Sequence, residues 1–91
     1  MPQDHIDKIN RWDAELDATG LLCPLPVLRA RKKLLSMAPG TVLRVLASDP
    51  AARIDMPHFC AEQGHELLDV SEVTSPPAQA YRIRVRSNPR Q

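Results

Sequence analysis

Hydrophobic and polar residues separate onto two sides of a helix between residues 24 and 38. On a helical wheel the apolar side holds Val27, Leu28, Ala30, Leu34, Leu35, Met37 and Ala38, and the opposite side holds Arg29, Lys32, Lys33 and Ser36. This spacing is typical of a surface helix that packs on a sheet through its apolar side. Pro39-Gly40 follows directly and is expected to end the helix, since glycine commonly stands just past a helix end.

Other segments have the patterns of strands. The clearest alternation runs over residues 81–86, with Tyr81, Ile83 and Val85 on one face and Arg82, Arg84 and Arg86 on the other. Residues 41–47 are mostly apolar, which is typical of a central strand covered by helices. Residues 14–17 and 66–73 are the remaining predicted strands, and Ser75-Pro76-Pro77 is expected to break the chain before the last one.

A second helix is predicted between Asp55, as its N-cap, and Gly64, which ends it. The resulting order is strand, helix, strand, helix, strand, strand. It predicts a two-layer α/β sandwich, β-α-β-α-β-β, in which a four-stranded mixed sheet carries both helices on one face. We expect the first two strands to be parallel, with a right-handed crossover, and the last two to form a hairpin. This topology places residue 23 at the carboxyl edge of the sheet, a common position for reactive groups.

Composition limits the class of protein further. The 91 residues fit one domain, assigned to residues 13–87, with a loosely ordered leader at 1–12 and a tail at 88–91. A net charge of +1 argues against a wholly basic nucleic-acid binder, and Trp12, Phe59 and Tyr81 are too few aromatic residues for a base-stacking platform. The polar start of the chain has no signal-peptide or membrane-spanning stretch, and two cysteines make no disulfide framework. We therefore expect a cytoplasmic protein with reduced thiols.

Cys23 carries the strongest chemical signal, because it stands directly before the first helix in the run Gly20-Leu21-Leu22-Cys23-Pro24-Leu25-Pro26. As helix N-cap its sulfur would face unpaired N–H groups and the positive end of the helix dipole, which favour the thiolate. Pro24 suits the first helical position, and Pro26 removes a second donor, so Leu25 and Val27 are expected to carry the N–H groups nearest the sulfur. The alternative is an inert buried cysteine before a proline-rich helix start.

Taken together with other short motifs, this run resembles the TusA (SirA-like) sulfur carrier proteins over residues 14–86. The resemblance rests on Leu16-Asp17-Ala18-Thr19-Gly20-Leu21-Leu22-Cys23-Pro24-Leu25-Pro26, Arg31-Lys32, Pro39-Gly40, Asp49-Pro50, Asp55-Met56-Pro57, Phe59-Cys60 and Gly64-His65-Glu66-Leu67. It implies a fold like the C-terminal domain of a bacterial translation initiation factor. It also implies that Cys23 accepts sulfane sulfur as a persulfide from a cysteine desulfurase or a rhodanese and passes it to a cysteine of another protein.

Relatives in this family serve 2-thiolation of the tRNA wobble uridine, molybdenum-cofactor supply or sulfur oxidation, and tRNA thiolation is the pathway that we favour here. Such a carrier turns over no small molecule on its own, and its transfer chemistry needs no metal, cofactor or general base. A carrier that presents one thiol to successive partners is most simply a monomer. We expect no membrane and no stable nucleic-acid partner.

Several residues near Cys23 are candidates to support it. Pro24, Leu25, Pro26, Arg31 and Asp55 are assigned to support of the thiolate and its loop. Arg31 either orients a carboxylate, on a partner or at Asp17 or Asp55, or extends past the core edge as a purely structural residue. Asp49 and Asp55 are most simply helix-starting caps. Arg29, Lys32 and Lys33 form either a solvated basic face or a docking patch for acidic partner surfaces.

The remaining candidates have simpler structural interpretations. Cys60 is expected to be a core thiol rather than a resolving cysteine, and His58, Cys60 and His65 lack zinc-ligand spacing, so no metal is expected. Arg82, Arg84 and Arg86 would contact RNA phosphates or keep an edge strand soluble. Two other functions therefore stay open: a non-catalytic regulatory or RNA-binding module, and a thiol redox protein that resolves Cys23 through Cys60 or an external thiol.

Overall fold

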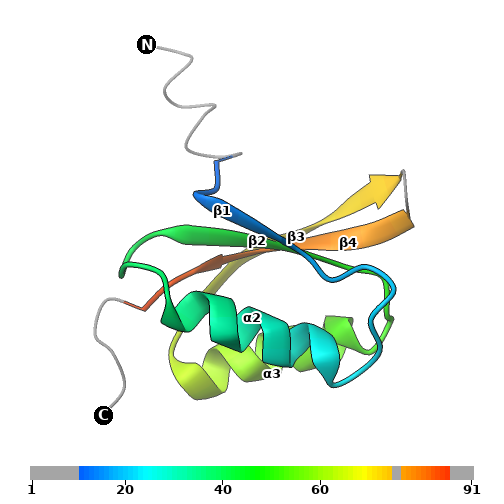
Figure 1. The fold of residues 1–91 in the computed structure, drawn as a ribbon, viewed down its shortest axis with the longest axis horizontal. Helices are drawn as coiled ribbons and strands as arrows, with labels where there is room; N and C mark the ends of the chain where they lie inside the picture. Colours follow the sequence, from blue (N-terminus) through cyan, green and yellow to red (C-terminus); the bar gives the residue numbers. More distant parts are fainter. Residues whose placement is uncertain (1–10, 75–76, 87–91) are drawn as a thin grey trace.

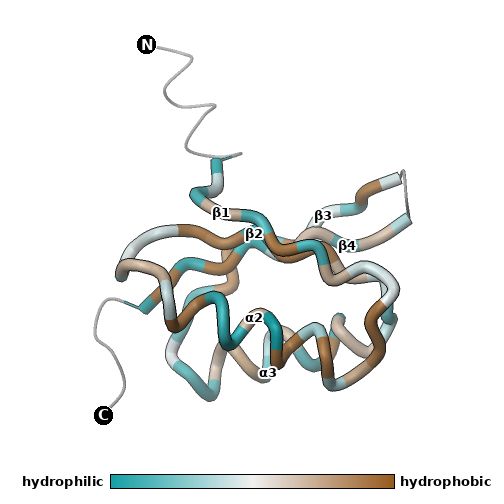
Figure 2. Tube along the Cα trace, viewed as in Figure 1, coloured by the Kyte–Doolittle hydropathy of each residue, from teal (hydrophilic) through white to brown (hydrophobic). Residues whose placement is uncertain are grey.

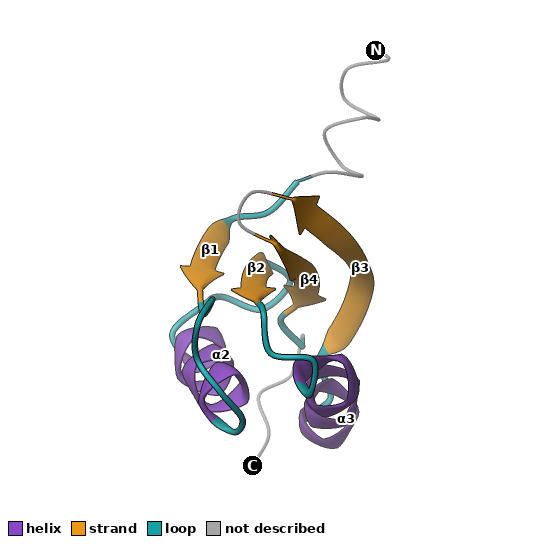
Figure 3. Cartoon of the chain, turned by 90° about the vertical axis from the view of Figure 1, so that its right-hand side faces the viewer, coloured by secondary structure: helices purple, strands orange, loops and turns teal. Residues whose placement is uncertain are grey.

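The computed structural model describes residues 11–74 and 77–86 and has the predicted order of strands and helices. Its elements are β1 (Ala14–Asp17), α2 (Leu25–Leu35), β2 (Val42–Ala47), α3 (Ala52–Gln63), β3 (Glu66–Thr74) and β4 (Pro77–Arg84) (Figure 1). The four strands form one sheet in the order β1-β2-β4-β3, and both helices cover the same face of it (Figure 3). The two-layer α/β sandwich is therefore confirmed.

Strand pairing places the two N-terminal strands side by side at one end of the sheet. β1 pairs with β2 in parallel, and β3 and β4 form the predicted antiparallel hairpin. β4 also pairs with β2, Val45 lying opposite Tyr81, so β4 is an interior strand. The interpretation of its arginines as protection for an edge strand is wrong, because β3 covers the edge of β4. β4 begins at Pro77 rather than at residue 81, as a proline can at the first position of a strand.

The core lies between the sheet and the helices. Along β4 and just past its end the alternation predicted from sequence is observed, since Tyr81, Ile83 and Val85 are all buried in the core. They meet Leu43 and Val45 of β2, a strand that is mostly brown in Figure 2. The helices contribute Ala30, Leu34, Met56, Phe59 and Cys60.

α2 buries a narrower apolar face than the wheel predicts. Its buried residues are Pro26, Ala30 and Leu34, which are spaced four residues apart. The helix ends at Leu35. Leu28 and Leu35 were expected on the buried side, but they are 51% and 72% exposed. The reason is that the helix packs on the sheet through a single ridge, Pro26, Ala30 and Leu34, so Leu28 and Leu35 at the borders of its apolar sector remain in solvent.

α3 begins earlier than predicted. The turn at Asp49 starts it: Oδ1 of Asp49 accepts a 3.1 Å hydrogen bond from the Ala51 N–H, and the Asp49 carbonyl accepts one from Ala52. Asp55 therefore lies inside the first turn and is not the N-cap. Gly64 ends the helix in the left-handed conformation, with φ at 80°, as predicted.

The predicted leader and tail fall mostly outside the described residues. At the described edge of the leader, the Arg44 guanidinium lies 4.4 Å from the ring centre of Trp12. The carbonyl of Arg11 accepts a hydrogen bond from Arg82. These contacts tie the start of the described chain to strands β2 and β4.

Candidate functional site

Cys23 lies in the loop from β1 to α2, at the carboxyl edge of the two parallel strands, as predicted. Three backbone hydrogen bonds fasten this loop to β2 and to the loop that follows it. Ala18 donates to the Leu46 carbonyl at 2.8 Å, Gly20 to Ser48 Oγ at 2.9 Å, and Cys23 to Asp49 Oδ2 at 2.6 Å. Asp49 thus binds both its own helix start and the backbone of Cys23.

The start of α2 differs from the prediction by one position. Pro24 is the N-cap, Leu25 is the first helical residue, and Cys23 precedes the cap. The Leu25 N–H donates to the Leu22 carbonyl at 2.8 Å, so it is not available to the sulfur. Residues 22–25 form a turn, and α2 begins at its last residue, Leu25. The expectation that Cys23 is the N-cap, facing the Leu25 N–H, is therefore wrong.

Carboxylates, rather than helix donors, dominate the electrostatics of the thiol. A hydrogen bond to the Asp55 carboxylate, partial desolvation, and the negative charges of Asp55 and Asp49 all raise the pKa of Cys23 above its ordinary value. Asp55 does lie against Cys23, but it favours the thiol and does not support the thiolate. The prediction that the helix start lowers the pKa of Cys23 is therefore wrong, because the pKa is raised.

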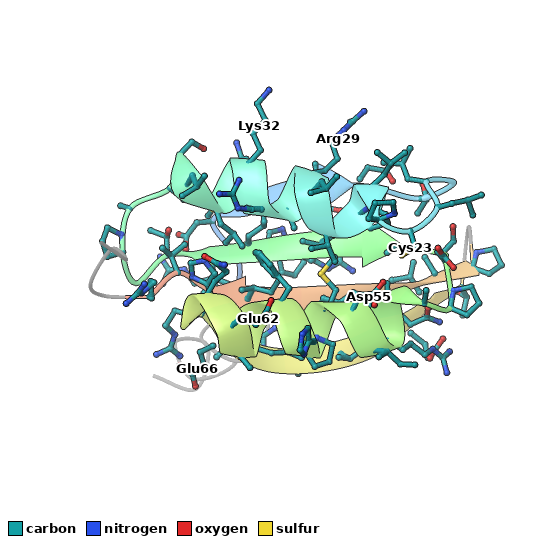
Figure 4. All side chains as sticks on the ribbon, turned by 90° about the horizontal axis from the view of Figure 1, so that it is seen from below. Cys23, Arg29, Lys32, Asp55, Glu62 and Glu66 are labelled. Carbon is teal, nitrogen blue, oxygen red and sulfur yellow. The ribbon has the colours of Figure 1, made fainter. Side chains whose placement is uncertain are left out.

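A surface pocket of about 240 Å³ surrounds the thiol between the two helices. The α2 side provides Cys23, Pro24 and Val27, and the α3 side provides Asp55, His58, Phe59 and Glu62. Figure 4 shows Asp55 near Cys23 at one end of α3, with Glu62 further along the same helix. His58 Nε2 lies 3.4 Å from Glu62 Oε2.

Sequence reasoning missed His58 and Glu62 as neighbours of the thiol. Their spacing from Asp55 held the signal, because residues 55, 58, 59 and 62 follow the three- and four-residue steps of one helix face. That signal could be used only once Asp55 was known to lie inside the helix.

The other predicted support residues separate into near and distant groups. Pro24 and Leu25 are exposed beside the thiol, and Pro26 is buried under the helix start. Arg31 is exposed, and within the described residues its side chain makes no hydrogen bond or ion pair with Asp17 or Asp55. The interpretation that Arg31 orients the carboxylate of Asp17 or Asp55 is therefore wrong.

The basic residues of α2 are solvent-exposed and lie apart from the thiol pocket. Arg29 and Lys32 point away from α3 (Figure 4), and Lys33 is exposed as well. Leu22 and Leu25, next to Cys23 in the chain, are 68% and 42% exposed. The surface around the thiol thus combines apolar side chains, an acidic pocket on α3 and a more distant basic face on α2.

Cys60 is a core thiol, as predicted. It is 2% exposed, and burial raises its pKa to about 11. Both cysteines are free thiols. Among residues 11–74 and 77–86, no group of three or more His, Cys, Asp and Glu side chains is placed to hold a metal ion. Neither described helix combines the length and apolar character needed to cross a membrane.

The arginines of the β4 segment are matched with acidic groups or packed on the chain. Arg82 pairs with Asp69, and Arg84 Nη1 lies 3.7 Å from Glu66 Oε1. The Arg86 guanidinium lies against Gly64 at the end of α3, where one of its nitrogens is buried. Arg82 and Arg84 therefore face acidic partners, and Arg86 packs against the end of α3.

Comparison with known proteins gives consistent results. The family model described as "Sulfurtransferase TusA" matches residues 14–87. The sulfur carrier protein TusA of Pseudomonas paraeruginosa is 52% identical over 60 residues, which cover 66% of this chain and 76% of that protein. TusA of Pseudomonas syringae pv. syringae is 45% identical over 76 residues, covering 84% and 88%. The crystal structure of a SirA-like protein from Desulfitobacterium hafniense superposes with a TM-score of 0.67 at 25% identity, covering 78% of this chain and 96% of that one.

Proposed function

Because this chain belongs to the TusA family of sulfurtransferases, we propose that it carries sulfur as a persulfide on Cys23. A donor protein provides the sulfur from a persulfide of its own, and an acceptor protein takes it through a cysteine. The carrier links the two proteins and is regenerated in each cycle.

The chemistry needs only the thiol and its two partners. The Cys23 sulfur loses its proton and attacks the outer sulfur of the donor persulfide. The sulfur–sulfur bond in the donor breaks, a new one forms on Cys23, and the donor cysteine leaves as a thiolate that takes up a proton. An acceptor thiolate then attacks the outer sulfur on Cys23, which regenerates the Cys23 thiol after protonation.

The contrast between the two cysteines carries this proposal. Cys23 is exposed at the sheet edge, whereas Cys60 is 2% exposed and has a pKa of about 11. Only Cys23 is therefore placed to meet a partner's sulfur. The same contrast weakens the thiol redox alternative, because Cys60 cannot reach Cys23 as a resolving thiol without leaving the core.

We further propose a cysteine desulfurase or a rhodanese as donor, and an acceptor in the 2-thiolation of tRNA. Arg29, Lys32 and Lys33 would attract acidic partner surfaces, while exposed Leu22 and Leu25 would contact the partner beside the reacting sulfurs. The reaction requires a reduced Cys23, which favours the cytoplasm as its compartment. A monomer leaves the thiol open to each partner in turn.

Transfer of radiolabelled sulfur tests the proposal. The protein is incubated with a cysteine desulfurase and labelled cysteine, then separated from both and mixed with a candidate acceptor. We expect wild type and Cys60→Ser to take up reductant-sensitive label and pass it on, and Cys23→Ser to take up none. Labelling of Cys23→Ser equal to wild type would contradict the proposal. Separate reactions with thiosulfate and a rhodanese identify the donor class.

A further inference from the structure

Asp55 occupies a distinct place beside the reactive sulfur. It stands in the first turn of α3, half-buried, and lines the same pocket between the helices as Cys23, close to which its side chain lies (Figure 4). Asp49 Oδ2 accepts a 2.6 Å hydrogen bond from the Cys23 backbone N–H, which keeps the Cys23 loop next to the start of α3, where Asp55 stands. We propose that Asp55 is a positioning residue that keeps Cys23 in its thiol form in the undocked carrier and slows loss of the bound sulfur to small thiols.

The charged groups around the sulfur lie on the α3 side of the pocket and favour this role. The loop before α3 provides Asp49, and α3 provides Asp55, His58 and Glu62, with His58 beside Glu62 at 3.4 Å. α2 provides Pro24 and Val27 to the same pocket, and neither carries a charge. Arg29 and Lys32 of α2 point away from α3 (Figure 4). The nearest charges are therefore acidic, and they oppose formation of a second negative charge on sulfur.

The effect on sulfur acceptance has two opposing parts. A thiol held by a carboxylate is deprotonated less often, so fewer molecules can attack at neutral pH. Its thiolate, once formed, is the stronger nucleophile, because nucleophilicity rises with pKa along a Brønsted slope of about 0.4 to 0.5. If the pKa of the thiol rises by one unit, the rate constant of its thiolate thus rises about threefold. At a pH below the pKa of the thiol, the fall in the thiolate fraction outweighs the gain in nucleophilicity, so a raised pKa slows the attack.

The effect on sulfur release follows from the leaving group. When a small thiolate attacks the outer sulfur of the Cys23 persulfide, Cys23 must leave as a thiolate beside Asp55. A leaving thiol of higher pKa leaves more slowly, and the carboxylate also repels an anionic attacker such as glutathione. This part rests on the proposed carrier function. A docked acceptor that supplies a proton or a cationic side chain near Asp55 would remove the restraint where transfer is wanted.

Asp55→Asn tests the first part without any sulfur transfer. The alkylation rate of Cys23 with iodoacetamide is measured across pH for wild type, Asp55→Asn and Glu66→Gln. The last variant is a matched loss of one carboxylate, at the start of β3 and far from Cys23 (Figure 4). We expect Asp55→Asn to move the midpoint to lower pH, to react faster than wild type near pH 7, and to react more slowly on the alkaline plateau. Glu66→Gln should follow wild type. A change in accessibility alone would shift all rates in one direction, and an unchanged Asp55→Asn profile would overturn the proposal.

A second experiment separates this inference from the proposed function. Wild type and Asp55→Asn are loaded with sulfur, and the persulfide lifetime is followed by mass in glutathione. We expect at least a twofold shorter lifetime in Asp55→Asn, with partial recovery in Asp55→Glu. Equal lifetimes would overturn the protective role while leaving the carrier function intact. Failure of every variant and wild type to load, together with a shifted alkylation profile, would instead contradict the carrier function. Thermal unfolding verifies that each variant is folded, and Asp55→Ser replaces Asp55→Asn if that variant does not fold.

Discussion

The backbone N–H of Cys23 donates a 2.6 Å hydrogen bond to Oδ2 of Asp49, 26 residues further along the chain. The same carboxylate accepts the Ala51 N–H through Oδ1. One side chain therefore joins the reactive loop to the start of α3. The site depends on this connection, because Cys23 and Asp55 face each other only while the two loops stay together.

Asp49→Ala should loosen this connection. It removes two hydrogen bonds to a charged acceptor, each of which contributes about 1.5 to 3 kcal/mol when shielded from solvent. Because the Cys23 bond is solvent-exposed, we expect the free energy of unfolding in urea to fall by less than their sum, by about 1 to 2 kcal/mol. Amide hydrogen exchange at Cys23 should accelerate as well. Ser48→Ala, which removes only the Gly20 hydrogen bond, is the control and should cost less. Slow exchange at Cys23 in Asp49→Ala would show that the loop is held by other contacts.

The two cysteines should differ sharply in reactivity. At pH 8, iodoacetamide should modify Cys23 in the folded protein and leave Cys60 unmodified, because Cys60 is buried and its pKa is about 11. In urea both should react, which peptide mass analysis can show. Since the folded state raises the pKa of Cys60 from 9.0, stability should fall as pH rises from about 9 to about 11. Cys60→Ala, which loses this titration, should show a smaller loss.

His65 should make the protein less stable in acid. Its Nδ1 accepts a 3.1 Å hydrogen bond from the Arg86 N–H, and desolvation and the Arg86 charge lower its pKa from 6.5. The unfolded state therefore binds a proton before the folded state does, and the free energy of unfolding should fall as pH drops below 6.5. Urea unfolding at pH 7.5 and 5.5 measures this. His65→Gln should reduce the difference, whereas His58→Gln, at an exposed position, should retain it.

Alanine substitutions at two glycines can distinguish the cost of backbone strain from the cost of steric crowding. Gly64 and Gly40 have φ of 80° and 87°, in the left-handed region, so alanine at either position should cost about 1 to 2 kcal/mol. A Cβ at Gly64 would also lie 3.2 Å from Arg86 Nε, whereas at Gly40 it would meet nothing within 4 Å. We expect Gly64→Ala to lower the unfolding midpoint in urea more than Gly40→Ala. Equal losses would mean that Arg86 moves aside freely.

The basic face of α2 should control the rate of partner encounter. The double variant Arg29→Glu/Lys32→Glu should lower the rate of sulfur transfer from a protein donor with an acidic surface, and added salt should reduce the difference from wild type. Alkylation of Cys23 by iodoacetamide serves as the control and should hardly change, since both side chains point away from the pocket (Figure 4). Equal transfer rates at low salt would exclude this face as the docking patch.

Local patterns predicted the elements of the fold well. Residues 14–17 form β1 as expected, and the buried positions Tyr81 and Ile83 of β4, with Val85 just after it, were predicted correctly. These features depend on neighbours in the chain, through alternation and turn residues. The exposure of Leu28 and Leu35 could not be read in the same way, because it depends on how much of α2 the sheet covers.

The location of Cys23 could be predicted from sequence, but its electrostatic surroundings could not. The strand and helix order placed Cys23 at the sheet edge, and Cys60 was recognised as a core residue. The direction of the Cys23 pKa depends on Asp49 and Asp55, which reach it from another loop and helix. No local pattern around Cys23 contains those carboxylates. Placing Asp55 at an N-cap rather than within α3 also hid His58 and Glu62 from the predicted site.

The most direct test of the account is the intact mass of the protein after incubation with a cysteine desulfurase and cysteine. We expect wild type and Cys60→Ser to gain the mass of one sulfur atom, which a reductant removes, and Cys23→Ser to gain none. A sulfur gain in Cys23→Ser that is lost in Cys60→Ser would contradict the assignment of Cys23 as the carrier site. No gain in wild type, with this donor or with thiosulfate and a rhodanese, would contradict the carrier function itself.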